Sequence, residues 1–221
     1  MLGRLKMGLA VLAMVATPAF AQRTDISVGM VLEPPNLDPT TGAAAAIREV
    51  TYSNIYEGLT RFGPDGSVNP GLAHDWEISD DGLTYTFHLR EGVQFHDGTP
   101  FSADDVVFSL DRARAEDSTN AQKQLFAAID TVTAIDPLTV EVVLTQPQGA
   151  FLFNMAWGDA VIMSPESVET NATNPVGTGA FRFARWVQGD RVELERNPDY
   201  WGQGAQLERA TFRFISDPSA A

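Results

Sequence analysis

Cysteine is absent from the 221 residues, and positive charge is scarce. Without cysteine the chain forms no disulfide and offers neither a thiol nucleophile nor thiolate ligands for zinc or an iron–sulfur cluster. Fifteen lysine and arginine residues stand against 29 aspartate and glutamate residues, so the formal net charge is -14. Such a chain repels nucleic-acid phosphates and anionic lipid, and we expect no nucleic-acid partner.

The sequence motifs of several large enzyme classes are missing as well. There is no glycine-rich phosphate loop with its lysine, no GxSxG turn around a serine nucleophile and no HExxH zinc site. His74, His88 and His96 show no i, i+4 spacing that would place two metal ligands on one helix face. The acidic pairs Asp80-Asp81 and Asp104-Asp105 fall where a turn and a helix start already favour aspartate. The sequence therefore predicts no enzyme, no metal site and no cofactor, although residues from distant segments could still assemble a hydrolase triad.

The first 21 residues have the three parts of a secretory signal peptide. Arg4 and Lys6 form a short positive region, residues 7–15 are apolar apart from one glycine, and Ala19-Phe20-Ala21 is a small-x-small cleavage sequence. The apolar run is too short for a permanent membrane anchor. The alternative is a buried N-terminal helix. We predict cleavage after Ala21 and export, most simply to a periplasm.

The remaining chain mixes strands and helices without strict alternation. Apolar residues at four-residue spacing predict a helix within residues 43–59, and an alternating run predicts a strand over Leu83–Arg90. Ser102 is a predicted N-cap of a second helix. Two strands at 132–135 and 139–144 are predicted to form a hairpin around the Asp136-Pro137 turn, and further strands are predicted at 181–186, 191–196 and 211–215. This order disfavours a plain doubly wound parallel sheet and indicates a mixed α/β (α+β) class.

Aromatic and amide side chains cluster near irregular backbone. Asn36 follows two prolines, Tyr52, Asn54 and Tyr56 lie on the predicted first helix, and Trp157 follows an apolar segment. On loops above a rigid scaffold such groups suit non-covalent capture of an organic solute. The alternative is that these aromatic rings fill the core with their polar tips satisfied.

Several blocks of the sequence, taken together and in order, carry a family resemblance. They are Leu37-Asp38-Pro39, Ile55-Tyr56-Glu57-Gly58-Leu59, Leu72-Ala73-His74-Asp75-Trp76-Glu77, the stretch 82–106, Asn174-Pro175-Val176-Gly177-Thr178-Gly179-Ala180-Phe181 and Arg196-Asn197-Pro198-Asp199-Tyr200-Trp201. The chain resembles the peptide/nickel-binding (family 5) group of ABC-importer solute-binding proteins. Ala180 is a mild departure, because the family usually has proline after Gly-Thr-Gly.

This resemblance implies a two-lobe periplasmic-binding-protein-like fold of type II, cluster C-like. Residues 22–60 and 171–221 would build the first lobe, 61–170 an added subdomain within it, and the second lobe would lie outside this chain. The implied function is periplasmic capture of a short peptide or similar small solute, as a monomer, for delivery to an ABC permease at the inner membrane. Presentation of the ligand to a membrane receptor would use the same lobes. The alternative is an exported hydrolase of unrelated class.

The resemblance also indicates which residues contact the ligand. Glu33 and Pro34 match a segment that faces the ligand backbone in oligopeptide-binding relatives, where extended peptides bind like an added strand. The block Gly177-Thr178-Gly179 crosses near the cleft, or alternatively forms a tight turn that needs glycine. With the aromatic and amide groups, the predicted ligand-binding residues are Glu33, Pro34, Asn36, Tyr56, Trp157, Gly177, Thr178 and Gly179.

Overall fold

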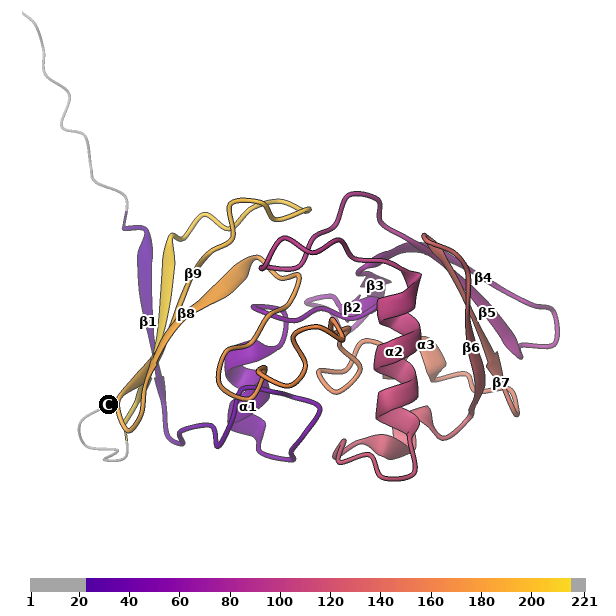
Figure 1. Ribbon diagram of the computed structural model, residues 1–221, viewed down its shortest axis with the longest axis horizontal. Coiled ribbons are helices and arrows are strands. Elements are labelled where there is room, and N and C mark those ends of the chain that lie inside the picture. Colours follow the sequence, from indigo (N-terminus) through magenta and orange to yellow (C-terminus); the bar gives the residue numbers. More distant parts are fainter. Residues whose placement is uncertain (1–22, 216–221) are drawn as a thin grey trace, which may run out of the picture.

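The computed structural model describes residues 23–215, and two four-stranded sheets flank a middle layer of helices and loops (Figure 1). The elements are β1 (Asp25–Met30), α1 (Ala45–Thr51), β2 (Thr60–Phe62), β3 (Val68–Pro70), β4 (Ala73–Ile78), β5 (Thr84–Leu89), α2 (Ala103–Arg114), the 3-10 turn η1 (Lys123–Phe126), β6 (Ile129–Asp136), β7 (Thr139–Leu144), α3 (Phe151–Asn154), β8 (Phe181–Val187), β9 (Arg191–Arg196) and β10 (Arg209–Phe214). This mixture confirms the α/β class expected from the sequence. The predicted signal peptide and its cleavage site lie outside the described residues.

The first sheet, which we call the split sheet, joins the beginning and the end of the described chain. Its strand order is β1-β10-β9-β8, with β1 parallel to β10 and the other pairs antiparallel. Because β1 and β10 are parallel, their carboxyl ends lie at the same edge, the lower edge in Figure 1. Val192, Leu194 and Phe212 on its inner face share a core with residues of α1.

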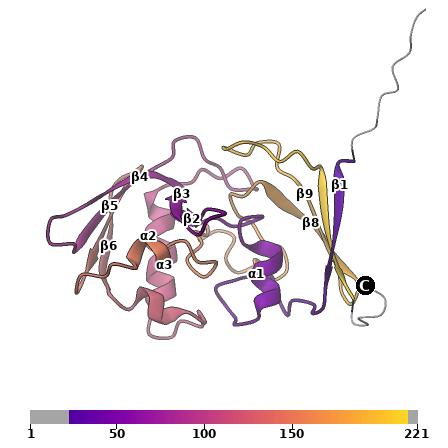
Figure 2. The same cartoon turned by 180° about the vertical axis from the view of Figure 1, so that it is seen from behind.

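The second sheet, the contiguous sheet, is built from residues that follow one another in the chain. Its order is β4-β5-β7-β6, antiparallel throughout, and α2 packs against it (Figures 1 and 2). The alternation predicted over Leu83–Arg90 is confirmed, since Tyr85, Phe87 and Leu89 are buried and the residues between them are half-buried. The predicted hairpin at residues 132–144 is also confirmed, with β6 starting earlier than predicted.

Local side-chain chemistry fixes the start of α2. Ser102 precedes the helix as predicted, and the Asp105 carboxylate accepts hydrogen bonds from the Ser102 backbone N–H at 2.8 Å and from its hydroxyl at 3.3 Å. Asp104 and Asp105 lie in the first turn, where the helix dipole favours negative charge. The structure thus accounts for this acidic pair by helix capping.

The helix predicted within residues 43–59 is too long and needs correction. Only Ala45–Thr51 is helical, so Tyr52, Asn54 and Tyr56 follow the helix instead of lying on it. The chain leaves the helix at Tyr52, whose backbone is extended with φ of -68° and ψ of 132°, and Ser53 follows in a left-handed conformation with φ of 57°. Ile55 and Leu59 are nevertheless buried, which explains the misleading four-residue spacing.

Six elements were not predicted: β1, β2, β3, β4, η1 and α3. Strand β4 shows why, since Ala73 is its only fully buried residue and the burial pattern does not alternate. Among residues 23–215, no helix combines the length and the apolar character needed to cross a membrane.

Candidate functional site

The carboxyl ends of β1 and β10 form the edge at which a ligand site is expected. In open α/β sheets, ligands bind in the crevice outside the carboxyl ends of the strands. The segment after β1 starts with two apolar side chains that face solvent, Val31 at 74% and Leu32 at 69% exposure. We call the edge formed by residues 31–42, with the last turn of α2 beside it, the rim.

The main chain of the rim is unpaired where it leaves the sheet. The backbone N–H and C=O groups of Leu32 and Glu33 form no hydrogen bond with another described residue. The Glu33 side chain points to the split sheet instead, where its carboxylate accepts a hydrogen bond from Trp186 Nε1 at 2.9 Å and one from the Gly189 N–H at 3.0 Å. Pro34 is buried. These anchors hold the segment in place and leave its main chain open.

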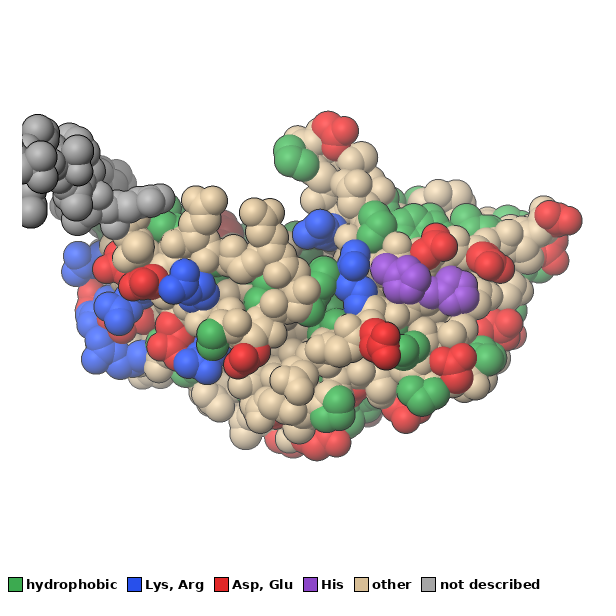
Figure 3. All heavy atoms as spheres, turned by 90° about the horizontal axis from the view of Figure 1, so that it is seen from above, with side chains coloured by type: hydrophobic (Ala, Val, Ile, Leu, Met, Phe, Trp, Pro, Cys, Tyr) green, Lys and Arg blue, Asp and Glu red, His purple; other side chains and the backbone are tan. Residues whose placement is uncertain are grey.

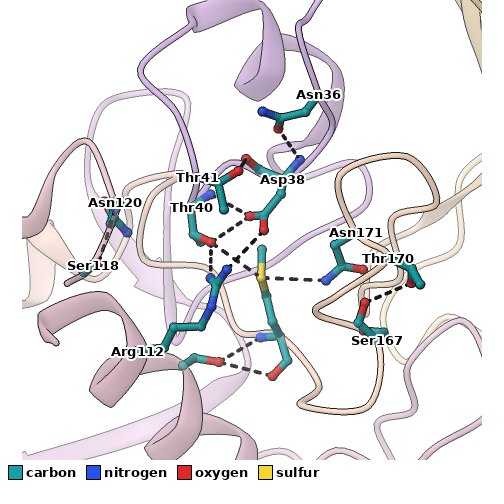
Figure 4. A network of polar contacts seen from close by, with 12 residues as sticks. Asn36, Asp38, Thr40, Thr41, Arg112, Ser118, Asn120, Ser167, Thr170 and Asn171 are labelled. Atoms are coloured by element: carbon teal, nitrogen blue, oxygen red, sulfur yellow. Dashed lines mark hydrogen bonds and ion pairs between the residues drawn. The ribbon is translucent and has the colours of Figure 1, made fainter.

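A buried ion-pair network attaches the rim to α2 (Figure 4). The Asp38 side chain is 2% exposed, and its carboxylate accepts hydrogen bonds from the Thr40 N–H at 2.8 Å and from the Thr40 hydroxyl at 2.7 Å. Arg112 of α2 lies 3.4 Å from the same carboxylate and also donates to the Thr40 hydroxyl. Removing one partner of a buried pair leaves an uncompensated charge, so the network makes the loop and the helix one unit.

Beside this network lies a small hollow of about 180 Å³, lined by groups that include Thr40, Arg112, Ser118 and Asn120. Asn120 is 5% exposed, and its amide donates to the Asp159 carbonyl at 2.9 Å. Asp159 in turn pairs with Arg48 of α1, whose Nε lies 2.9 Å from the carboxylate. The Asn36 side chain accepts a hydrogen bond from the Asp38 N–H at 2.9 Å, which stabilises a turn within the rim. The rim thus offers polar groups on a fixed frame, which suits non-covalent binding.

The Gly177-Thr178-Gly179 segment lies beneath the surface, packed against the residues that follow α1. A Cβ atom at Gly177 would stand 2.1 Å from the Ile55 carbonyl oxygen, and one at Gly179 would stand 2.2 Å from the Asn54 carbonyl oxygen. Backbone packing this close explains both glycines without a ligand. Contact of these residues with a ligand stays a prediction.

Two half-buried titratable side chains, Glu57 and His96, hold this segment through hydrogen bonds. The Glu57 carboxylate accepts hydrogen bonds from the Thr178 and Tyr200 hydroxyls at 2.9 and 2.7 Å and from Trp201 Nε1 at 2.8 Å. Burial raises the pKa of Glu57, and these three donors oppose the rise. His96 accepts at Nδ1 from the Gly177 N–H at 3.3 Å and donates from Nε2 to the Gly179 carbonyl at 3.0 Å.

Burial lowers the pKa of His96, and this bonding pattern needs the neutral imidazole. Sequence reasoning missed Glu57 as a structural centre. Its three partners lie 121 to 144 residues away, and no spacing rule connects them.

Tyr56 and Trp157 occupy other environments. Tyr56 is fully buried, its hydroxyl has no hydrogen-bond partner among the described residues, and burial raises its pKa well above the usual value. Trp157 is 38% exposed, and its ring packs edge-to-face with that of Phe153. The Phe153 ring also contacts Phe62. Of the eight predicted residues, the structure therefore brings Glu33, Pro34 and Asn36 together at the rim.

Comparison with known proteins gives a consistent result. Residues 67–221 match the family model for bacterial extracellular solute-binding proteins, family 5. The chain is 38% identical over 211 residues to the glutathione-binding protein GsiB of Pectobacterium atrosepticum, with 93% of this chain and 40% of that protein covered. It is 32% identical to the dipeptide-binding protein of Escherichia coli K12, with 98% of this chain and 45% of that protein covered.

Solved structures of similar proteins have the same fold. AgaA from A. tumefaciens R10 in complex with agropinic acid matches with a TM-score of 0.83 and 30% identity over 89% of this chain and 40% of that one. The oligopeptide-binding protein AppA from Bacillus subtilis in complex with a nonapeptide matches with a TM-score of 0.82 and 27% identity, over 89% of this chain and 41% of that one. These neighbours are type II periplasmic binding proteins, as the resemblance implied, and none supports the hydrolase alternative. The chain spans about 40% of the length of the relatives named here.

Proposed function

Because the chain belongs to the family 5 bacterial extracellular solute-binding proteins, we propose that its natural gene product captures a short peptide or similar solute for an ABC permease. It acts as a monomer in the periplasm after cleavage behind Ala21, and it binds its solute without catalysis. Relatives named for glutathione and for dipeptides favour a ligand of two or three residues.

The observation that carries this proposal is that the main chain of Leu32 and Glu33 at the rim forms no hydrogen bond with another residue among 23–215. An extended peptide can bind to such a segment as an added strand, through main-chain hydrogen bonds that do not depend on its side chains. Glu33 takes part through its backbone, since its carboxylate is occupied by Trp186 and Gly189. The exposed side chains of Val31 and Leu32 add apolar surface next to these groups.

The division of the chain is part of the proposal. Residues 22–60 and 171–221 belong to the first lobe and 61–170 to its added subdomain, and the relatives' greater length provides for a second lobe. Two separate buried clusters, one under each sheet, support this division in outline, although Val161 and Met163 of the subdomain lie in the cluster under the split sheet and Leu59 lies in the other. Closure of a second lobe over the rim would remove the ligand from water, which one wall alone does not do.

Calorimetric titration of the natural gene product with dialanine, trialanine and glutathione tests the proposal. We expect micromolar or tighter binding of at least one of them. Leu32→Pro removes one main-chain donor and should weaken that binding roughly tenfold, the effect of one hydrogen bond of about 1.5 kcal/mol. Leu32→Ala keeps the donor and serves as the matched control, with an expected loss of about twofold or less. Equal losses in the two variants, or no binding tighter than about millimolar, would contradict the proposal.

A further inference from the structure

A second hollow lies away from the rim. It has a volume of about 580 Å³, and its lining includes Ser53, Arg61, Phe62, Asn69 and Arg90. Figure 3 looks down on the face opposite to the carboxyl ends of β1 and β10, and basic side chains stand there beside a recess at the middle of the molecule. Nothing in the proposed peptide site uses these residues.

Arg61 enters this hollow from a two-stranded ribbon formed by β2 and β3, which is separate from the two larger sheets. It lies on β2 directly opposite Asn69 of β3, so both side chains project from the same face of the ribbon. Arg61 is exposed, and its guanidinium forms no hydrogen bond or ion pair with another described residue. An unpaired guanidinium in a chain of net charge -14 is unusual, because carboxylates greatly outnumber basic groups.

Arg90 enters the same hollow from the end of β5 and is held rigidly. Its Nε donates to the Gly71 carbonyl at 2.7 Å, and its Cζ lies 4.5 Å from the centroid of the Trp201 ring. It has no ion pair with a described carboxylate. Stacking on an aromatic face fixes the plane of a guanidinium and leaves its remaining N–H groups available to an anion.

This arrangement differs from that of the other arginines. Within residues 23–215, every arginine except Arg23, Arg61, Arg90 and Arg209 pairs with a carboxylate. Arg23 and Arg209 line another surface together with Asp25 and Glu193, so carboxylates already stand beside them. The hollow of Arg61 and Arg90 has no carboxylate in its lining.

Backbone strain marks the same place. Ser53, which lines the hollow, is the one residue other than glycine with a positive φ in the described chain, at 57°. Such strain persists only where surrounding structure enforces it, and it is frequent at binding sites. Here the Ser53 N–H donates to the Tyr56 carbonyl at 2.9 Å, which holds the turn against the hollow.

The half-buried acid Glu57 does not account for both arginines. Its carboxylate is bonded by neutral donors from Thr178, Tyr200 and Trp201, and it forms no ion pair among the described residues. One half-buried carboxylate against two guanidinium groups leaves at least one positive charge without a counterion. An anion from solution would supply it.

We propose that this hollow binds a small organic carboxylate, held between the guanidinium groups of Arg61 and Arg90 with the Asn69 amide as a neutral donor. The planar fork of arginine matches the two oxygens of a carboxylate. Phe62, Pro64 and Pro70 in the lining provide an apolar wall for the carbon chain of the acid.

Calorimetric titration of the natural gene product with citrate and succinate tests this site, and titration with inorganic phosphate distinguishes an organic carboxylate from an inorganic anion. We expect citrate to bind with a dissociation constant below about 1 mM and phosphate to bind at least tenfold more weakly. Arg61→Gln should weaken citrate binding about tenfold or more, since it removes charge-assisted hydrogen bonds. The citrate affinity of Arg61→Lys should lie between those of wild type and Arg61→Gln.

The matched control is Arg209→Gln, which removes the same charge from an unpaired arginine on the other surface and should leave citrate binding within about twofold. Arg90→Gln should weaken binding as well, and Arg61→Gln decides the case because the exposed Arg61 side chain forms no hydrogen bond or ion pair with another described residue. No saturable citrate binding up to about 10 mM would overturn the proposal, as would equal affinities of wild type and Arg61→Gln. Phosphate binding as tight as citrate would overturn the assignment to a carboxylate.

Discussion

Strand β7 of the contiguous sheet and strand β1 of the split sheet differ in how much of their apolar surface the described chain covers. Val140 and Val142 of β7 are 0% exposed, whereas Ile26 and Val28 of β1 are 44% and 38% exposed. The contiguous sheet forms from residues 73–144 and has α2 packed on it. In the split sheet, β1 pairs only with β10 among the described strands, and the two are 184 residues apart in register.

This difference teaches where function is placed. The central strand β7 of the contiguous sheet is covered on its apolar face, although Ile78 and Ile135 in the outer strands of that sheet are 47% and 57% exposed. The split sheet ends at the rim, where the main chain of Leu32 and Glu33 forms no hydrogen bond with another described residue. Strand edges and apolar surface left uncovered are places where another segment or molecule binds. The predictions below test the contrast, beginning with the largest expected effect.

The centre of the contiguous sheet should be the most sensitive position. Phe87 is 0% exposed and packs with Tyr85, Phe151 and Trp76. Phe87→Ala should lower the free energy of unfolding by about 3–5 kcal/mol in denaturant melts. His88→Ala, on the half-buried opposite face of the same strand, should change it by no more than about 0.5 kcal/mol. Equal effects would mean that the two faces of β5 are not distinct.

The junction between the two sheets should be next in sensitivity. Gly177→Ala would place a methyl group 2.1 Å from the Ile55 carbonyl oxygen, so backbone must move. We expect a loss of about 1–3 kcal/mol in the free energy of unfolding. Gly204→Ala is the control, because a Cβ atom there meets nothing within 4 Å and the change should be within about 0.5 kcal/mol. A neutral Gly177→Ala would show that the segment relaxes freely.

The contiguous sheet was largely predictable from the sequence because its determinants are local. Alternation placed β5, a serine before two aspartates placed α2, and an Asp-Pro turn placed the β6–β7 hairpin. The length of α1 was not predictable, since the backbone becomes extended at Tyr52 and left-handed at Ser53 while the buried Ile55 continues the helical spacing.

The strands predicted at 181–186, 191–196 and 211–215 are confirmed as β8, β9 and β10 of the split sheet. The addition of β1 to that sheet and the assembly of the site depend instead on contacts between distant residues. Parallel pairing of β1 with β10, the pair of Asp38 with Arg112 and the bonds around Glu57 each cross more than 70 residues. The spacing of residues along the sequence does not indicate such contacts. Glu33 and Pro34 were placed near the ligand by family resemblance, and the hydrogen bonds of Glu33 to Trp186 and Gly189 became visible only in the folded chain.

Acid should weaken the junction through His96. Its pKa is lowered by burial in the folded state and is about 6.5 in the unfolded chain. The unfolded state therefore takes up the proton first as the pH falls. The contribution of His96 to stability is complete above about pH 6.5 and is lost as the pH falls from there toward the folded-state pKa.

Unfolding free energies measured from pH 8 to pH 5 should thus fall more steeply for wild type than for His96→Gln, which cannot titrate. Gly204→Ala, which changes no titratable group, is the control and should keep the wild-type slope. A His96→Gln slope identical to that of wild type would show that the imidazole between Gly177 and Gly179 does not titrate differently in the two states.

The smallest effect is expected at the uncovered edge of the split sheet. Val28 is 38% exposed on β1, so Val28→Thr adds a hydroxyl that water can solvate, and the free energy of unfolding should change by no more than about 0.5 kcal/mol. The same substitution at Val142, which is 0% exposed in β7, buries the hydroxyl and should cost about 1–3 kcal/mol. Parallel denaturant melts of the two variants measure the contrast directly. If Val28→Thr costs as much as Val142→Thr in the natural gene product, another part of that protein covers β1, and Val28 is then buried as Val142 is.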